Sequence, residues 1–327
     1  MFEVGINTNN ECGENFSEII ENIKDAGFEN VMVAFIADNK KNENFIIETK
    51  KLGFNIPFVH LYSKQTNSFW SKGEKNKALV KNIIEQIELC AKYKIPVAVL
   101  HATLGDPEIM ALPPSSFALE CMNNILRTAK QCNVKIALEN LDSLSKEHFT
   151  YFLNNISSPN LGLCYDAGHH NLYFPDFDIL SKYGDKLWAI HLHDNLMDWQ
   201  YGHDYSRDLH LLPFDGKIDY EAICKKIAQT NYNGVVMLEV HKQTCSEPKK
   251  YKDLDNKNYL SLAKQSAEKL AEIIKNFKEQ LWEKSHLMKH HKFITVKTAN
   301  PLNMILVKKT LTFQCFRSME NFQKMVF

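Results

Sequence analysis

Eight short apolar segments, each followed by a longer amphipathic segment, set the strongest constraint on the fold of this chain. Runs such as 95–101 (IPVAVLH) are apolar almost throughout, which is typical of strands covered on both faces. Segments such as 80–92 (VKNIIEQIELCAK) have apolar residues at three- and four-residue spacing, which indicates a helix with one buried face. The expected strands lie near residues 3–7, 30–36, 55–61, 95–101, 134–139, 161–166, 187–192 and 234–240. The expected helices lie near residues 15–27, 43–52, 74–93, 115–132, 143–154, 175–183, 217–230 and 258–281.

Eight strand-then-helix units in about 280 residues have the count and length of a (β/α)8 barrel. An open, doubly wound sheet is the structural alternative, and it normally carries a glycine-rich phosphate loop after its first strand. The sequence there reads GINTNNECGENF, which is not that motif. We therefore predict an α/β fold, a (β/α)8 TIM barrel over residues 1–282, as a single domain with an extra C-terminal tail.

Residues 283–327 differ in composition from the rest of the chain. Between Lys284 and Met319 there is no Asp or Glu, whereas Lys and His recur. One interpretation is a basic tail outside the barrel, poorly ordered in part. The alternative is a basic arm that binds an anion or a partner chain.

The composition argues against some classes of protein. The formal net charge is +0, which speaks against a surface that binds nucleic acid. Eight scattered cysteines without a CxxC pair predict a reducing, cytoplasmic setting. We see no signal peptide, and no apolar run approaches the roughly 18 residues that a membrane span requires. We therefore expect a cytoplasmic protein without a membrane partner. A homo-oligomer is possible, and the sequence does not decide it.

Several of the expected strands end in an acid or a histidine. In a (β/α)8 barrel the C-terminal ends of all strands meet at one face, which carries the active site. Imidazole and carboxylate groups together are typical ligands of a divalent transition metal. Six such endings in one chain are hard to attribute to chance. These endings are His60, His101, Glu139, Asp166, His191 and Glu239.

Two of these endings are glutamates on different sides of the expected barrel. Glu139 ends the fifth strand and Glu239 the eighth, so that they approach the axis from different directions. Two carboxylates beside a small substrate can share a metal, and one can take a proton that the other returns. We predict that both are metal ligands and catalytic acid and base. For either one alone, a strand-end acid paired with Lys or Arg is the alternative.

Histidines accompany two further strand ends. Asp166 and His169 form a D-x-x-H pair whose side chains are expected to face one cavity, while the neighbouring His170 points away. His191 and His193 alternate along a strand end and so point to one side. We predict Asp166 and His191 as metal ligands and His193 as a substrate contact. His169 is expected to be a further ligand or a substrate contact.

The segment that follows His193 is a long connection with its own polar residues. Connections of about two dozen residues without structure are uncommon and often functional. Asp208 and His210 form a D-x-H pair there that could bind a second metal or contact a substrate, and a solvated loop is an equal alternative. Asp194 is expected to orient an imidazole by hydrogen bond. Trp199 is expected to wall a sugar ring, with ordinary packing as the alternative.

His60 and His101 end the third and fourth expected strands. A lone histidine at such a place is more often a packed or hydrogen-bonded residue than a ligand. Because these two share a rim with four other candidates, we expect them to be additional metal ligands or, for His101, a substrate contact.

At these residues the chain resembles the xylose-isomerase-like barrels, a superfamily that holds sugar phosphate isomerases and epimerases together with endonuclease IV. The resemblance covers roughly residues 3–280 and rests on five motifs. They are ALEN (137–140), LCYDAGH (163–169), IHLHDN (190–195), DLHLLPFDGKIDY (208–220) and GVVMLEV (234–240). One departure is the turn Pro213-Phe-Asp-Gly216, in which the family usually has Pro-Gly-x-Gly.

The resemblance implies two activities, of which we predict the first. A metal ion (Mn²⁺, Co²⁺, Mg²⁺ or Zn²⁺) held by four residues would support a sugar or sugar phosphate isomerase or epimerase of carbohydrate metabolism. The paired glutamates would then exchange a proton with a small-molecule substrate through an enediolate. The four residues that this implies are Glu139, Asp166, His191 and Glu239.

The alternative is a hydrolase that cleaves abasic DNA with a multinuclear zinc site. The near-zero net charge and the acidic segment at 194–208 speak against a DNA backbone there. A non-catalytic barrel that binds a sugar is a third interpretation, which the intact glutamate pair disfavours. The residues that match the three zinc sites of endonuclease IV are His60, His101, Glu139, Asp166, His169, His191, Asp208, His210 and Glu239.

Overall fold

The computed structural model describes residues 2–104, 112–142, 146–196, 208–242, 251 and 253–297. The chain divides into two compact units, residues 1–277 and residues 278–327. All of the strands lie in the first unit, as do the candidate site residues that the structure describes. None of the described helices is long and apolar enough to cross a membrane.

All eight expected strands are present as parallel neighbours in one sheet, in the order β7-β6-β5-β4-β3-β2-β1-β8. The two outer strands also meet, because Leu192 and Leu238 form a parallel bridge. The Leu192 amide donates to the Met237 carbonyl, and the Glu239 amide donates to the Leu192 carbonyl. The sheet is therefore a nearly closed barrel, and the predicted (β/α)8 TIM barrel is confirmed. The strands are β1 (Val4–Asn7), β2 (Asn30–Ala34), β3 (Phe58–His60), β4 (Val97–His101), β5 (Lys135–Glu139), β6 (Leu161–Asp166), β7 (Leu187–His191) and β8 (Val236–Leu238).

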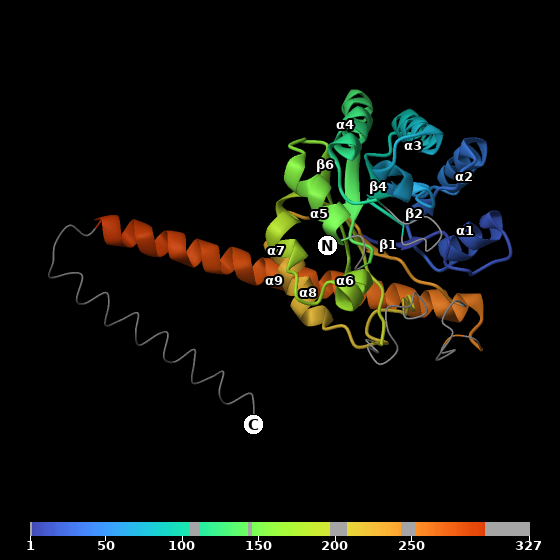
Figure 1. Cartoon of the computed structure of the whole chain (residues 1–327). Coiled ribbons are helices and arrows are strands. Elements are labelled where there is room, and N and C mark those ends of the chain that lie inside the picture. The colour runs from blue at the N-terminus through green and yellow to red at the C-terminus, as the bar shows by residue number, and fades with distance from the viewer. Residues whose placement is uncertain are drawn as a thin grey trace. The chain divides into compact units, whose positions relative to one another are not determined.

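Helices alternate with the strands, and in Figure 1 the helices α1 to α4 lie around the outside of the strands. The α-helices are α1 (Phe16–Asp25), α2 (Asn39–Lys51), α3 (Glu74–Lys92), α4 (Ser116–Gln131), α5 (Lys146–Asn155), α6 (Ala167–Tyr173), α7 (Ile179–Tyr183), α8 (Tyr220–Gln229) and α9 (Asn256–Lys297). Two short 3-10 helices, η1 (Thr66–Trp70) and η2 (Gly184–Lys186), complete the set within the described residues.

Two helices differ from the sequence-based expectation. The single helix expected near 175–183 is replaced by α6 and α7, and α6 begins directly where β6 ends. The helix expected near 258–281 is α9, which continues to Lys297. The predicted boundary between residues 282 and 283 therefore falls inside a helix, and the role of the tail stays a prediction.

A small cluster of buried apolar side chains fills the barrel interior. Because side chains alternate between the two faces of a strand, inward-facing residues recur at every second position. Val97 and Val99 of β4 belong to this cluster, and the next residue in the series is His101. Ala137 of β5 belongs to it as well, and the next in that series is Glu139. The packed interior therefore ends, at the C-terminal mouth, in candidate ligands.

A larger apolar cluster lies between the strands and the helices. In α3 the buried residues include Leu79, Ile83, Ile87 and Cys90, which repeat at spacings of three and four. This is the single buried face that the pattern at 80–92 predicts. The helices that pack in this way make the barrel a rigid support for the residues at its mouth.

The segment after β7 is anchored to the barrel by the buried carboxylate of Asp194. Its Oδ1 accepts hydrogen bonds from the backbone N–H groups of Asn195 (2.8 Å) and Ile218 (3.1 Å). Its Oδ2 accepts one from Phe214 (3.0 Å), and Asp194 and Leu211 exchange both of their backbone hydrogen bonds. We expected Asp194 to orient an imidazole; its carboxylate instead organises the backbone of the returning segment.

The turn at Pro213–Gly216 shows how the chain accommodates the missing first glycine. Phe214 occupies that position with a φ of 75°, a backbone conformation that bulky residues rarely adopt. Its ring lies 5.3 Å from the Tyr220 ring, centroid to centroid, and 3.8 Å from Lys269 Nζ, and these contacts offset the backbone strain. A Cβ at Gly216, in contrast, would lie 2.2 Å from an oxygen of Asp194, so this glycine is required.

Replacing Asp194 with alanine is expected to lower the free energy of unfolding by on the order of 3 kcal/mol, because three backbone N–H groups lose their buried acceptor. Denaturant unfolding of the purified chain measures this. Asp219→Ala is the matched control, since Asp219 caps α8 at the surface and its loss should cost only about 1 kcal/mol. Equal losses in the two variants would contradict the anchoring role of Asp194.

Candidate metal centre

The strand-end candidates lie level with one another at one mouth of the barrel. In the strand register His101 is the partner of Glu139, and Asp166 is the partner of His191. Within the described residues, the predicted ligands fall into three clusters whose donor atoms lie within 4.8 Å of one another. The first cluster is His60, His101 and Glu139; the second is Glu139, Asp166, His191 and Glu239; the third is His169, His193, Asp208 and His210.

Glu139 belongs to the first and second clusters at once. Its Oε2 lies 3.2 Å from Nε2 of His60 and 3.2 Å from Nε2 of His101. Its Oε1 lies 3.2 Å from Nδ1 of His191 and 3.4 Å from Nδ1 of His169. A carboxylate with one oxygen in each of two ligand clusters has the arrangement of a ligand that bridges two metal ions.

The second cluster is centred on the imidazole of His191, which is fully buried. Its Nδ1 lies 2.9 Å from Oε2 of Glu239 and 3.9 Å from Oδ2 of Asp166. Cys164 also lies beside His191, and burial raises the pKa of its thiol to about 12. The thiol therefore stays protonated at neutral pH, and the carboxylates are the anionic ligands of this cluster.

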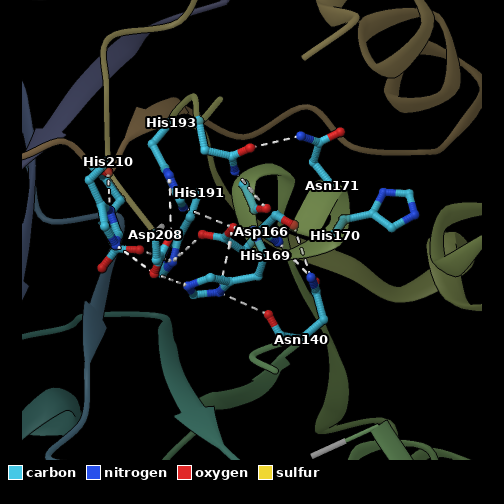
Figure 2. A network of polar contacts seen from close by, with 12 residues as sticks. Asn140, Asp166, His169, His170, Asn171, His191, His193, Asp208 and His210 are labelled. Atoms are coloured by element: carbon cyan, nitrogen blue, oxygen red, sulfur yellow. Dashed lines mark hydrogen bonds and ion pairs between the residues drawn. The ribbon is translucent and has the colours of Figure 1, made fainter. Parts of the chain in front are cut away.

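The third cluster is assembled by the start of α6 and by the segment that returns to the mouth after β7. Asp166 is the last residue of β6 and the N-cap of α6, and its Oδ1 accepts a hydrogen bond from the His169 backbone N–H (2.7 Å). Nε2 of His169 and Nε2 of His210 lie 2.9 Å and 3.1 Å from Oδ2 of Asp208. Figure 2 shows these side chains pointing toward one another, while His170 points away, as predicted.

Three imidazoles are held in the tautomer that a metal ligand needs. In each, Nδ1 faces a backbone carbonyl oxygen and must carry the proton, so that the lone pair on Nε2 points into the centre. These bonds are His60 to Leu61 (2.9 Å), His169 to Asn140 (3.0 Å) and His210 to Glu239 (2.7 Å). The same pattern is common in histidines that bind metals.

The first cluster brings three potential metal-binding atoms close together. Nε2 of His60 and Nε2 of His101 lie only 3.0 Å apart, and both face the same oxygen of Glu139. With the His60 proton on Nδ1, a proton on Nε2 of His101 can link these atoms by hydrogen bonds. A divalent cation between the three atoms could take the place of that proton.

Several buried polar atoms of the centre have no hydrogen-bond partner among the described residues. Leaving such atoms unpaired in a protein interior is costly, and a cation is one way to satisfy them. The atoms are His101 Nδ1, Glu139 Oε1, Asp166 Oδ2, both ring nitrogens of His191, His193 Nδ1 and Asp208 Oδ1. Apart from Nδ1 of His101 and Nε2 of His191, these atoms face the clusters. The residues present therefore fit a set of divalent metal ions.

The charges of the centre compensate one another when no metal is bound. Burial by itself would raise the pKa of the Glu139 carboxyl, but the imidazoles of His191 and His101 hold it well below its usual range. Burial likewise opposes protonation of His210, but the carboxylate of Asp208 raises its pKa to about 9. Protons therefore act as the cations of the metal-free centre.

Of the remaining predicted contacts, His193 lies fully buried inside the third cluster, and Trp199 lies outside the described residues. The sequence-based prediction gave no role to Asn140, whose side-chain amide pairs with the backbone N–H and carbonyl of Asp166 (3.0 and 2.9 Å). It thereby holds two ligand-bearing strands together beyond the end of their ladder. His210 has a φ of 46°, a strained conformation of the kind that is found at functional sites.

Comparison with known proteins assigns the chain to a family. A family model described as a xylose isomerase-like TIM barrel matches residues 20–277, and the chain belongs to this family. It is 32% identical over 188 residues to the uncharacterized protein y4fM of Sinorhizobium fredii, and this alignment covers 54% of this chain and 57% of that protein. It is 26% identical over 177 residues to the probable endonuclease 4 of Mycoplasma mycoides, which covers 46% of this chain and 55% of that protein. The chain thus matches little more than half the length of these relatives.

Solved structures share the same barrel. A D-tagatose 3-epimerase-like protein has a TM-score of 0.59 at 20% identity, covering 86% of this chain and 99% of that one. The IOLI protein, whose structure holds a zinc atom, has a TM-score of 0.65 at 17% identity, covering 84% and 99%. At these identities the likeness establishes the fold. The family model therefore places the chain among the xylose isomerase-like TIM barrels, and the solved structures agree with it in fold.

The bridging position of Glu139 predicts a double effect on metal content. Glu139→Gln is expected to remove or weaken two metal ions per chain, because both clusters lose a charged ligand, whereas His60→Gln should affect only one. Elemental analysis after equilibration with a chelator measures the metal that remains. An equal loss in the two variants would contradict the bridging role.

Metal binding is also expected to release protons. His210 has a pKa of about 9 without metal, so it holds a proton at pH 7 that a metal ion must displace. Metal affinity should therefore fall as the pH is lowered, and the His210 proton should no longer be released above about pH 9. Calorimetric titration in buffers of different ionisation enthalpy counts the protons. Proton release that does not change between pH 7 and pH 10 would contradict this assignment.

Proposed function

We propose that this protein is a metal-dependent hydrolase of phosphate esters, with a multinuclear centre of the endonuclease IV kind. The observation that carries the proposal is the position of Glu139, whose two carboxylate oxygens face two different ligand clusters. A third cluster lies beside them. A one-metal reaction needs only the second cluster, and it would leave the other two without a purpose.

The chemistry of phosphate esters fits such a centre. Metal ions, when bound, would lower the pKa of water and neutralise the charge that develops on the phosphoryl oxygens. The residues of the chain would hold the ions: Glu139 faces two clusters, and Asp166 and Glu239 supply further negative charge at the second. Asn140 keeps β5 and β6 aligned, so that the ligands of both strands stay at a fixed separation. The centre is closed below by the packed barrel interior, which leaves the mouth as the approach for substrate.

The substrate class follows from the same centre. An abasic DNA duplex is the first substrate to test, because the probable endonuclease 4 of Mycoplasma mycoides is a relative of this chain. All nine residues implied by the resemblance to endonuclease IV are described, and each belongs to one of the three clusters. Zinc is the metal that the imidazole-rich donor set favours.

A second candidate is a sugar or sugar phosphate isomerase or epimerase with one metal at the second cluster. It is favoured by the two glutamates, since Glu139 Oε1 and Glu239 Oε2 both approach Nδ1 of His191 (3.2 and 2.9 Å). One carboxylate could then take a proton from a carbon next to a carbonyl, and the other could return it. The substrate would be a small sugar, in line with the name of the D-tagatose 3-epimerase-like protein that shares the fold.

Histidines outside the second cluster distinguish the two candidates. If phosphate-ester hydrolysis is the reaction, His60→Gln and His210→Gln should each lower kcat at least about 100-fold, because a charged transition state loses a cation. If one-metal isomerisation is the reaction, both variants should stay within a few-fold of the wild-type chain. His170→Gln is the matched control, since His170 points away from the centre.

The assays use the full chain loaded with zinc or with manganese. Cleavage of an abasic duplex, or of a simple phosphodiester, is the expected result. The proposal is overturned if a chain shown to hold three metals cleaves neither. Exchange of a sugar carbon-bound hydrogen with solvent deuterium, with no phosphodiester cleavage, would establish the second candidate.

A further inference from the structure

We propose that His193 is a fourth ligand of the third cluster, so that its metal site is closed by protein atoms: Nε2 of His169, Nδ1 of His193, a carboxylate oxygen of Asp208 and Nε2 of His210. This inference rests on the metal centre of the proposed function, but not on the reaction. The sequence-based prediction made His193 a substrate contact, whereas its side chain is fully buried.

The two carboxylate oxygens of Asp166 have different partners, and these partners determine which ring nitrogen of His193 faces Asp166 as a donor. Oδ1 accepts the backbone N–H of His169 (2.7 Å) and lies 3.1 Å from Nε2 of His193. Oδ2 has no hydrogen-bond partner among the described residues and faces His191 in the second cluster. Nε2 of His193 therefore carries a proton that it donates to Oδ1, and Nδ1 is the ring nitrogen that is available to bind a metal ion.

The lone pair of His193 points at a second unsatisfied atom. Nδ1 of His193 and Oδ1 of Asp208 lie 3.7 Å apart, which is too long for a hydrogen bond. Both atoms are buried, and neither has a hydrogen-bond partner within the part of the chain that the structure describes. Two acceptors at this separation suit two ligands of one ion, since metal-to-ligand distances are about 2.0–2.2 Å.

The fold holds the His193 ring in this place from three sides. The ring stacks on His210, with centroids 3.9 Å apart and an angle of 17° between the planes, so the two rings must tilt toward a shared ion when they bind it. The Tyr220 hydroxyl donates to the His193 backbone carbonyl (2.7 Å). A Cβ at Gly168 would lie 1.9 Å from Cε1 of His193, so only glycine leaves room for the ring. Figure 2 shows His193 between Asp166 and the pair His210 and Asp208.

A closed set of three imidazoles and one carboxylate has consequences for the whole centre. Four protein ligands in a tetrahedral arrangement are typical of zinc sites that do not bind substrate. The first cluster, in contrast, has only His60, His101 and Glu139 among the described residues, and so keeps an open position. Substrate and water would therefore bind at the first and second clusters. The metal ion of the third cluster would be a fixed positive charge beside them. His193 also links the third cluster to the second through Asp166.

The replacement of His193 with glutamine distinguishes a metal ligand from a residue that only positions Asp166. In His193→Gln the side-chain amide still donates a hydrogen bond toward Asp166, but the second ring nitrogen is gone. We expect this variant to bind one of its three zinc ions at least about 10- to 100-fold more weakly, as measured by chelator competition. When cobalt replaces zinc, this variant should lack the visible absorption of one four-coordinate cobalt ion that the wild-type chain shows. His170→Gln, a change of the same kind one residue beyond His169, should bind all three ions like the wild-type chain.

Several results would decide the matter. Three zinc ions bound with wild-type affinity in folded His193→Gln would overturn the proposal, because His193 would then only position Asp166. If this variant does not fold, diffraction from the zinc-loaded wild-type chain decides instead: Nδ1 of His193 at about 2.0–2.1 Å from a zinc ion supports the proposal, and a distance beyond 3 Å overturns it. If the variant loses one ion and the wild-type chain cleaves no phosphodiester, the first result supports this inference and the second overturns the proposed function.

Discussion

The buried carboxylate of Glu139 is the interaction on which the metal centre depends. It is 1% exposed and lies among imidazoles contributed by β3, β4, β7 and α6. A carboxylate at this depth is stable only when cations and hydrogen-bond donors surround it, and removing one partner leaves the others uncompensated. Because its two oxygens serve different clusters, Glu139 couples them: neither cluster can change its charge without altering the field at the other.

The barrel and the positions of its strand-end candidate ligands were predictable because two short-range rules determine them. The period of two along a strand decides which residues face inward, and the C-terminal ends of parallel strands meet at one mouth. In β4 these rules take the chain from Val97 through Val99 to His101, and in β5 from Ala137 to Glu139. Neither step needs information from distant residues, so the pattern in the sequence was sufficient.

The depth of a side chain and the partners that surround it were not predictable in this way. Periodicity places His193 on the same side as His191, but it does not show that Gly168, from another element, leaves a space that the ring fills. The position of the described segment that follows Asp208 depends on the hydrogen bonds that Asp194 accepts from the backbone of Phe214 and Ile218. The net charge of the whole chain averages over the surface and says nothing of the imidazoles gathered at one mouth.

The way the centre is stabilised bears on how many metal ions it holds. In the third cluster His210 keeps a strained φ of 46°, and in the first cluster two imidazole nitrogens lie 3.0 Å apart. A single ion in the second cluster would contact neither group. Ions in all three clusters would bind these imidazoles, and since such ions would bind only the folded chain, they would stabilise the fold as well. In the multinuclear centre that we propose, folding and the binding of several metal ions would therefore be linked.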